Sequence, residues 1–316
     1  MSQRLSQSKL LAWYAESKRD LPWRNTNDAW KILLSEILLQ QTQVSRGIAY
    51  WKKLVARFPT PQAMADAHVD EVLLLWQGAG YYSRARRLHS LSLMVCLPSN
   101  EGGYDGRLPQ TAAELLKLPG VGPYTAAAVA SIAYGEPVAC VDGNIRRVMA
   151  RQSKNPEPSM KEVDAWAQDI LYSADAGNWN QALMELGATI CTPRRAQCTQ
   201  CPLASSCKGR ETPTAYPLPK KVKRKRLDLQ CTLRFDATGK PELVQRGSEG
   251  ILAGMWGPPM AENVNTEGLE LIGIIQHALS HRDLYVEVWL GSCSKGTDPS
   301  SVALSSLAQK ILSLGE

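Results

Sequence analysis

The sequence predicts two domains: an all-α domain over residues 1–207 and a small α+β domain over residues 227–316, joined by a linker at 208–226. Apolar residues recur at helical spacing as far as about residue 210, and a stretch rich in proline and basic residues follows. Strand-like segments come after it. With 316 residues, of which 44% are hydrophobic and 21% charged, the chain can build a core in each domain.

The first domain consists of segments in which apolar residues return every three or four positions, as on one face of a helix. Turn signals such as Gly78-Ala79-Gly80 and Pro119-Gly120 separate these segments. The helices expected from the pattern cover residues 8–17, 28–41, 44–57, 61–66, 70–76, 83–95, 111–117, 123–134, 142–151, 160–173 and 178–190. None of these segments alternates as a strand would, so this domain is expected to contain helices only.

The linker carries the basic excess of the chain. Residues 208–226 contain eight Lys and Arg and one acidic residue, a net charge of +7, whereas the whole chain has +6, so the remainder sums to −1. Such a segment can lie along a phosphate backbone, or it can be a solvated hinge or a localisation signal. Beyond it, strands are expected at 227–235, 242–245, 271–275 and 284–290, with a last helix at 301–313.

No apolar run reaches 18 residues and the N-terminus leads into a patterned helix, which argues against a membrane span and a signal peptide. Half of the eight cysteines lie together with the spacing C-x6-C-x2-C-x5-C: Cys191, Cys198, Cys201 and Cys207. This crowding predicts a metal centre rather than a disulfide framework. Four thiolates suit zinc or an iron–sulfur cluster, and their number does not decide between the two.

The stretch Leu118-Pro-Gly-Val-Gly-Pro-Tyr-Thr125 lies between two predicted helices. Its glycines allow a tight turn that presents backbone N–H groups of Gly120, Val121 and Gly122 to a phosphate oxygen. Such contacts position a protein on nucleic acid without reading its sequence. A plain helix–helix turn is the alternative reading.

Two carboxylates stand in unusual settings. Glu36 is surrounded by apolar residues in Trp30-Lys-Ile-Leu-Leu-Ser-Glu-Ile-Leu-Leu-Gln-Gln-Thr42, and burial would raise its pKa until it can donate a proton near neutral pH. Asp142, in Val141-Asp-Gly-Asn-Ile-Arg146, sits where a helix N-cap is expected. A solvated glutamate and a simple cap are the alternatives. Two carboxyl groups with different roles are what cleavage of a glycosidic bond requires.

Several motifs together resemble the MutY-type adenine DNA glycosylases, which belong to the helix-hairpin-helix glycosylases with a [4Fe–4S] cluster. The motifs are the cysteine spacing, Leu118–Thr125, Leu21-Pro-Trp-Arg24, Ser35–Val44, Gly78–Arg86 and Asn180–Gly187. The resemblance implies an all-α helix-hairpin-helix glycosylase domain, with a six-helix part at about 26–139 and a cluster part formed by 1–25 and 140–207. The four cysteines would hold the [4Fe–4S] cluster in a loop.

The resemblance also implies roles for individual residues in removing adenine that is mispaired with 8-oxoguanine or guanine. Glu36 would protonate adenine N7, and Asp142 would stabilise the sugar cation. Tyr124 and Asn144 would support the two carboxylates, and Trp23, Arg24 and Glu185 would line the pocket for the flipped adenine. Gln41 and Tyr81 would wedge into the base stack, and Thr42 would touch 8-oxoguanine. Extruding a base costs a few kcal/mol, which such wedges offset.

Tyr124 occupies the position at which bifunctional relatives carry a nucleophilic lysine. The resemblance therefore implies a monofunctional enzyme that leaves an abasic site. It further implies a monomer acting on double-stranded DNA with an A:8-oxoguanine or A:G mismatch and binding no membrane. Such an enzyme is expected in the cytoplasm, at the nucleoid, of a bacterium, or in the nucleus or mitochondria of a eukaryote.

The second domain contains Gly250-Ile-Leu-Ala-Gly-Met-Trp-Gly-Pro-Pro259 and His277-Ala-Leu-Ser-His-Arg282, which resemble the Nudix-like domain of the same enzymes. Ser280 and His281 would donate hydrogen bonds to 8-oxoguanine. Leu279 stands where the family usually has phenylalanine, and Ala79 replaces a leucine, so the preference for 8-oxoguanine over guanine stays open. The clustered glutamates of a Nudix hydrolase are missing, which argues against nucleotide hydrolysis.

Two other functions fit part of the pattern. One is a helix-hairpin-helix glycosylase that acts on thymine or another mismatched base, and the Gln-Gln-Thr-Gln stretch and the second domain argue against it. The other is a non-catalytic iron–sulfur protein that binds DNA. The presence of both Glu36 and Asp142 argues against that reading.

Overall fold

The computed structural model describes residues 2–219 and 223–315, and of residues 2–6 only the backbone. The linker predicted at 208–226 therefore includes three residues, 220–222, that lie outside the described part. Packing divides the chain into two compact units. The first unit is Met1–Ala63 with Ser90–Lys220, and the second is Met64–His89 with Lys221–Glu316. The boundaries expected from the sequence stay a prediction.

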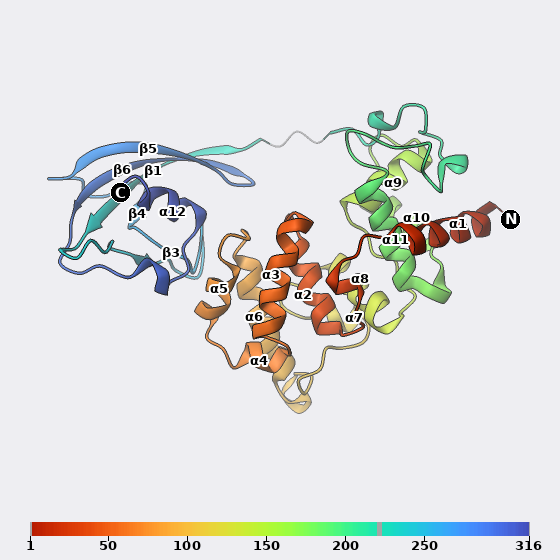
Figure 1. Cartoon of the computed structure of the whole chain (residues 1–316), viewed down its shortest axis with the longest axis horizontal. Helices are drawn as coiled ribbons and strands as arrows, with labels where there is room; N and C mark the ends of the chain where they lie inside the picture. Colours follow the sequence, from red (N-terminus) through yellow and green to blue (C-terminus); the bar gives the residue numbers. More distant parts are fainter. Residues whose placement is uncertain (1, 220–222, 316) are drawn as a thin grey trace. The chain divides into compact units, whose positions relative to one another are not determined.

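The predicted helices are present, and Figure 1 shows them along the chain. Their bounds are α1 Ser2–Ser17, α2 Ala29–Leu39, α3 Val44–Arg57, α4 Pro61–Ala65, α5 Val69–Trp76, α6 Ser83–Cys96, α7 Ala112–Leu115, α8 Pro123–Tyr134, α9 Gly143–Ser153, α10 Met160–Asp169, α11 Ala176–Thr189 and α12 Ser306–Leu312. None of the described helices is long and apolar enough to cross a membrane.

Local chemistry fixes where the site-bearing helices begin. The Asp28 side chain accepts hydrogen bonds from the Trp30 and Lys31 amides at the start of α2, and Pro123 opens α8, where its missing N–H costs nothing. Asp142 caps α9, and Asp175 caps α11 through the Asn178 amide. These caps set the positions from which the helices present their side chains.

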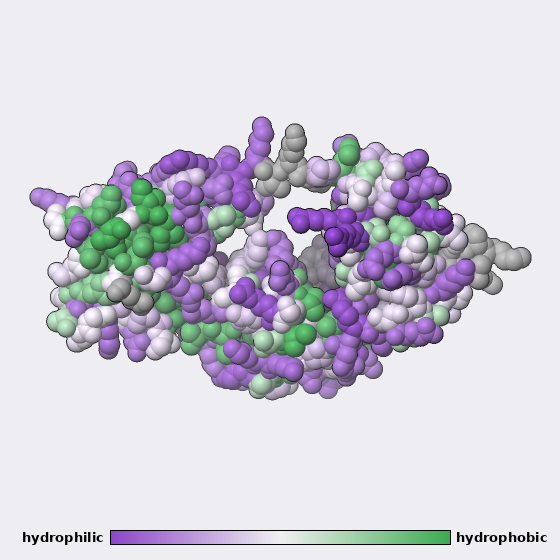
Figure 2. All heavy atoms as spheres, turned by 45° about the horizontal axis from the view of Figure 1, so that its top comes forward, coloured by the Kyte–Doolittle hydropathy of each residue, from purple (hydrophilic) through white to green (hydrophobic). Residues whose placement is uncertain are grey.

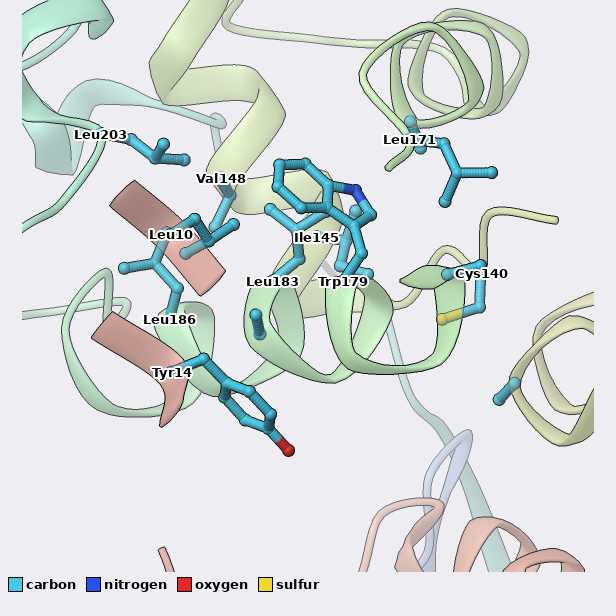
Figure 3. Packing of buried hydrophobic residues seen from close by; sticks show 14 of the residues in the cluster. Leu10, Tyr14, Cys140, Ile145, Val148, Leu171, Trp179, Leu183, Leu186 and Leu203 are labelled. Atoms are coloured by element: carbon cyan, nitrogen blue, oxygen red, sulfur yellow. The ribbon is translucent and has the colours of Figure 1, made fainter. Parts of the chain in front are cut away.

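A core in the first unit joins α1, α8, α9, α10 and α11 (Figure 3). Trp179 of α11 is 2% exposed at its centre, among Leu10 of α1 and Ile145 and Val148 of α9. Helix α2 packs against α3 and α8, and α8 in turn packs against α11. This packing places the C-terminal half of α2 and the N-termini of α8 and α9 around one region.

The strands of the second unit are β1 Lys225–Phe235, β2 Val244–Gln245, β3 Trp256–Gly257, β4 Met260–Ala261, β5 Glu270–Ala278 and β6 Arg282–Ser292. Four of them form a sheet in the order β4-β1-β6-β5, in which β1 and β6 run parallel and the other pairs antiparallel. Leu307 and Ile311 of α12 complete a core on one face of this sheet. Leu271 and Ile274 of β5 are exposed, and Figure 2 shows apolar surface on this part of the chain.

Candidate active site

A cavity of about 630 Å³ opens in the first unit. Its walls come from the loop and 3-10 helix before α2, from the end of α2 and from α8, α9 and α11. Nine of the residues singled out in the sequence line it: Trp23, Arg24, Glu36, Gln41, Thr42, Tyr124, Asp142, Asn144 and Glu185. Residues that are far apart in the sequence therefore meet around one hollow.

Glu36 lies on the buried side of α2 and is 8% exposed. Because α2 packs on α8, the Tyr124 hydroxyl donates a hydrogen bond of 2.6 Å to Glu36 Oε2. Burial raises the pKa of Glu36 to about 7; the Tyr124 hydrogen bond opposes this effect and nearby Asp142 adds to it. At neutral pH this carboxyl group can therefore hold a proton and release it.

Asp142 is both the cap of α9 and a wall of the cavity. The Ile145 amide donates to Oδ1 at 2.7 Å, and Asn144 Nδ2 donates to Oδ2 at 2.7 Å. Burial raises the pKa of Asp142 above its usual value, while these donors oppose the shift. The two carboxyl groups thus differ: Glu36 meets one hydroxyl, whereas Asp142 accepts bonds that favour its ionised form.

Glu185 of α11 is completely buried, with both carboxylate oxygens held by arginines. Arg19 donates through Nε and Nη2 at 2.7 Å each, and Arg24 donates through Nη2 at 2.7 Å. Burial would raise the pKa of Glu185, but the hydrogen bonds from Arg19 and then Arg24 outweigh it and hold the pKa at about 2. Trp23 is fixed beside this group by an edge contact with Trp51, 6.0 Å between ring centroids. This side of the cavity is a rigid wall of one indole ring and ionised groups.

Both predicted wedge residues have left-handed backbone. The φ angle is +60° at Gln41, just after α2, and +51° at Tyr81, just before α6. Residues with a Cβ rarely adopt this conformation, and it is common at sites where strain serves a function. Gln41 and Thr42 line the cavity of the first unit, whereas Tyr81 belongs to the second unit.

The predicted hairpin lies between α7 and α8, where Gly120 has a φ of +79°. Gly122 caps α8 without a side chain, and a Cβ built there would meet nothing within 4 Å. Val121 is buried between the two glycines. The Val121 amide donates to the Leu118 carbonyl at 3.2 Å, whereas no side-chain hydrogen bond caps the start of α8, so the amides there can meet an anion.

A second cavity, of about 480 Å³, lies within the second unit. Tyr81, Leu279, Ser280 and His281 line it, and the Tyr81 and Ser280 hydroxyls are 2.6 Å apart. Either hydroxyl can be the donor. The residues that were singled out for the second domain therefore meet one another and Tyr81.

The four cysteines of the cluster line one small cavity of the first unit and form no disulfide. Arg151 of α9 is 2% exposed, and its Nη1 donates to Cys191 Sγ at 3.2 Å. Arg151 thus ties α9 to the first cysteine of the group, and its Nη1 also donates to the Cys191 carbonyl at 3.1 Å. In the described part of the chain, no group of three or more His, Cys, Asp or Glu side chains is arranged to hold a metal ion as it stands.

Sequence reasoning missed Arg19 and Arg147. Arg19 precedes the Leu-Pro-Trp-Arg motif and has no signal of its own. Arg147 Nη2 donates to Asn144 Oδ1 at 2.8 Å, and its Nε donates to the Cys191 carbonyl at 2.8 Å. Helical spacing could have found Arg147, because it follows Asn144 by three residues on the same face of α9.

The fold and the pair of carboxyl groups define a class of protein. Residues 34–171 match the family model described as "HhH-GPD superfamily base excision DNA repair protein". A solved structure of a thermostable thymine-DNA glycosylase is similar, with a TM-score of 0.60 and 29% identity, over 66% of this chain and 96% of that chain.

Two curated relatives narrow the class. The adenine DNA glycosylase of Homo sapiens is 36% identical over 84% of this chain and 59% of its own length. The adenine DNA glycosylase of Rattus norvegicus is 34% identical over 93% of this chain and 72% of its own length. The chain belongs to the adenine DNA glycosylase family. It spans about three fifths of the length of the human relative.

Proposed function

We propose that this protein is a monofunctional adenine DNA glycosylase that removes adenine mispaired with 8-oxoguanine or guanine. The observation that carries the proposal is the pair of carboxyl groups in one cavity: Glu36 with a pKa of about 7, and Asp142 held by two donors. A group that is protonated at neutral pH and a group that favours a cation are the requirements for breaking an N-glycosidic bond.

In the proposed reaction, Glu36 gives its proton to N7 of the flipped adenine. The glycosidic bond breaks, its electron pair leaves with the base, and the sugar becomes an oxocarbenium ion. Asp142 stabilises this cation with its charge, and water then adds to the sugar, loses a proton and leaves an abasic site. Tyr124 stabilises the Glu36 carboxylate that remains, and Asn144 orients Asp142.

Base flipping assigns the remaining walls of the cavity. Trp23 offers a surface on which the flipped adenine can stack. Glu185 fixes Arg24, which can then donate a hydrogen bond to the ring atoms of the adenine. Gln41 and Tyr81 would fill the space that the base leaves in the stack, and both have the left-handed backbone that is common at functional sites. Gly120, Val121 and Gly122 would hold a phosphate of the DNA, and Thr42 would touch 8-oxoguanine.

Tyr124 supports a monofunctional enzyme. Its hydroxyl contacts Glu36, and no lysine lines the cavity in the part of the chain that the structure describes. A Schiff base to the sugar needs an amine at that place. Release of adenine is therefore expected to leave the DNA strand intact until heat or alkali is applied.

In the second unit, Ser280 and His281 are proposed to recognise 8-oxoguanine as part of a Nudix-like domain. Both line the cavity that also contains Tyr81, and hydroxyl and imidazole groups suit the polar edge of an oxidised guanine. Leu279 lines the same cavity with aliphatic bulk.

Cys191, Cys198, Cys201 and Cys207 are proposed to hold a [4Fe–4S] cluster. They suit it because all four thiols line one cavity and the Arg151 guanidinium lies beside one of them. Such a cluster would supply no step of base excision; it would order the loop at 191–207. Purified protein should be brown and absorb near 400 nm if iron is bound. The protein is proposed to act as a monomer on double-stranded DNA, in the compartments named above.

The test is a single-turnover assay on duplexes with adenine opposite 8-oxoguanine, guanine and cytosine, and with thymine opposite guanine. Adenine should be released from the first two, and Glu36→Gln should abolish the release. Release of thymine alone would favour the activity after which the solved relative is named. Release of no base from any duplex would contradict the proposal.

A further inference from the structure

The Tyr124 hydroxyl has two acceptors within reach. Oη is 2.6 Å from Glu36 Oε2 and 3.0 Å from Sδ of Met184, a half-buried residue of α11. All three side chains line the same cavity. A phenol carries one proton and donates to one acceptor at a time. Which acceptor it uses can therefore change with the ionisation of Glu36.

When Glu36 is ionised, its carboxylate is the stronger acceptor and takes the Tyr124 proton. When Glu36 is protonated at Oε2, the oxygen that faces Tyr124, its O–H can donate to Tyr124 Oη, and the phenol proton then needs another acceptor. We propose that Met184 is a positioning residue whose sulfur accepts the Tyr124 hydroxyl while Glu36 carries its proton. This inference rests on the proposed function, in which Glu36 is the acid.

The proton balance is simple. As Glu36 protonates the base, its O–H bond breaks and an N–H bond forms on adenine. The Tyr124 hydroxyl turns from the Met184 sulfur to the new carboxylate, and its own O–H bond stays intact. Met184 therefore stabilises the protonated state before transfer, and Tyr124 stabilises the ionised state after it.

Removing the Met184 sulfur should destabilise only the state in which Glu36 is protonated. A hydroxyl left without an acceptor in a buried site costs free energy, whereas the ionised state keeps its bond to Glu36. The groups that face Glu36 from the neighbouring elements, Tyr124, Asp142, Cys140 and Arg24, stay in place. The pKa of Glu36 should therefore fall when the sulfur is removed.

The variant is Met184→Leu, which keeps the volume of the side chain and removes the acceptor. In this variant, the decline of the single-turnover rate at high pH should begin about half to one pH unit lower than in the wild type. Near pH 8, release should therefore be about three- to tenfold slower. The matched control is Met149→Leu in α9, whose buried sulfur lies 3.7 Å from the Ser153 hydroxyl, and it should leave the profile in place. In a Tyr124→Phe background, Met184→Leu should cause no shift.

Titration of the Glu36 carboxyl group by carbon-13 NMR gives a readout without DNA, with the signal assigned by its loss in Glu36→Gln. The midpoint should move down by the same amount in Met184→Leu. If the wild type releases no base, the proposed function fails, yet this titration still tests Met184. An unmoved midpoint, or an equal loss of rate at every pH with and without the Tyr124 hydroxyl, would overturn the inference.

Discussion

At the scale of single residues, Glu36 and Asp142 line the same cavity but have different surroundings, which favour different protonation states. Glu36 lies on the apolar face of α2, and the Tyr124 hydroxyl donates a hydrogen bond to it; burial there favours its protonated form. Asp142 receives a backbone amide and a side-chain amide, which support a charge. A group that gives a proton and a group that keeps a charge thus stand in one cavity, as bond cleavage requires.

Asp142→Asn separates the two roles of that residue. Asparagine caps a helix about as well as aspartate, so the free energy of unfolding should change by less than about 1 kcal/mol. The charge opposite the sugar is lost, and adenine release should slow by about a hundredfold or more. Thermal unfolding and single-turnover rates measure the two effects. A variant that keeps its rate would contradict the catalytic role of the charge, and one that unfolds easily would contradict the expected equivalence of the two caps.

Glu36→Gln should cost activity and increase stability at high pH. The pKa of Glu36 is raised from 4.5 to about 7 in the folded chain, so its contribution to stability is present below 4.5 and is lost as the pH rises through about 7. At pH 8 the wild type should be destabilised by about 3 kcal/mol relative to pH 4 through this group. Denaturant unfolding of both proteins at the two pH values measures the difference. An equal gap at both pH values would contradict the burial of this carboxyl.

At the scale of elements, α9 and α11 pack closely at Gly187. A Cβ at this position would lie 2.6 Å from Asn144 Cβ and 3.2 Å from Asn144 Cα. Glycine therefore allows the start of α9, with Asp142 and Asn144, to rest against α11, which carries Met184 and Glu185. The geometry of the cavity depends on this close approach of the two helices.

Gly187→Ala should push the two helices apart and displace Asn144 from Asp142. We expect a destabilisation of about 1–3 kcal/mol, as for other overpacked sites, and a fall in adenine release of about tenfold or more. Gly247→Ala is the control, because a Cβ there meets nothing within 4 Å. Unfolding and single-turnover assays of both variants give the answer. Equal behaviour of the two would mean that the close approach at Gly187 does not shape the cavity.

The sequence predicted elements with strong periodicity well and others poorly. The expected helix at 123–134 coincides with α8, because proline at its start and glycine after its end mark both limits. The two-residue strands β3 and β4 were missed, because so short a strand has no period to detect. Glu36 was found from its apolar neighbours, whereas Glu185 and the catalytic role of Asp142 came from the family resemblance. Arg19 and Met184 were not found from the sequence, because their roles depend on contacts that form only when segments far apart in the chain pack together.

At the scale of the whole molecule, packing assigns residues 64–89, which contain α5 and the first half of α6, to the unit that contains the sheet. Tyr81, predicted to act with the adenine site, contacts Ser280 of that unit. Periodicity along the chain could not reveal this, because it reports which face of a helix is buried but not against what. The cavity that contains the two catalytic candidates lies in the first unit, and the cavity that contains Tyr81 and Ser280 lies in the second.

The basic linker gives a prediction at this scale. Arg224 and Arg226 make ion pairs with Asp283 and Asp228 of the strands, which leaves less of the basic charge for a partner than the sequence suggests. Replacing Lys220, Lys221 and Lys223 by glutamine should weaken DNA binding. The slope of log affinity against log salt should fall by up to about 0.9 for each phosphate that these lysines no longer neutralise. Binding titrations at several salt concentrations measure this slope. An unchanged slope, or a change in which base is removed, would show that the segment has another role.

The most direct test of the account is the pH dependence of adenine release under single-turnover conditions. The rate should fall above a pH of about 7, as Glu36 loses its proton, and again at low pH, as Asp142 gains one at a pH above the usual range of an aspartate. Glu36→Gln should show no release at any pH. A rate that stays constant well above pH 7, or a Glu36→Gln protein that still releases adenine, would contradict the claim that these two carboxyl groups cleave the bond.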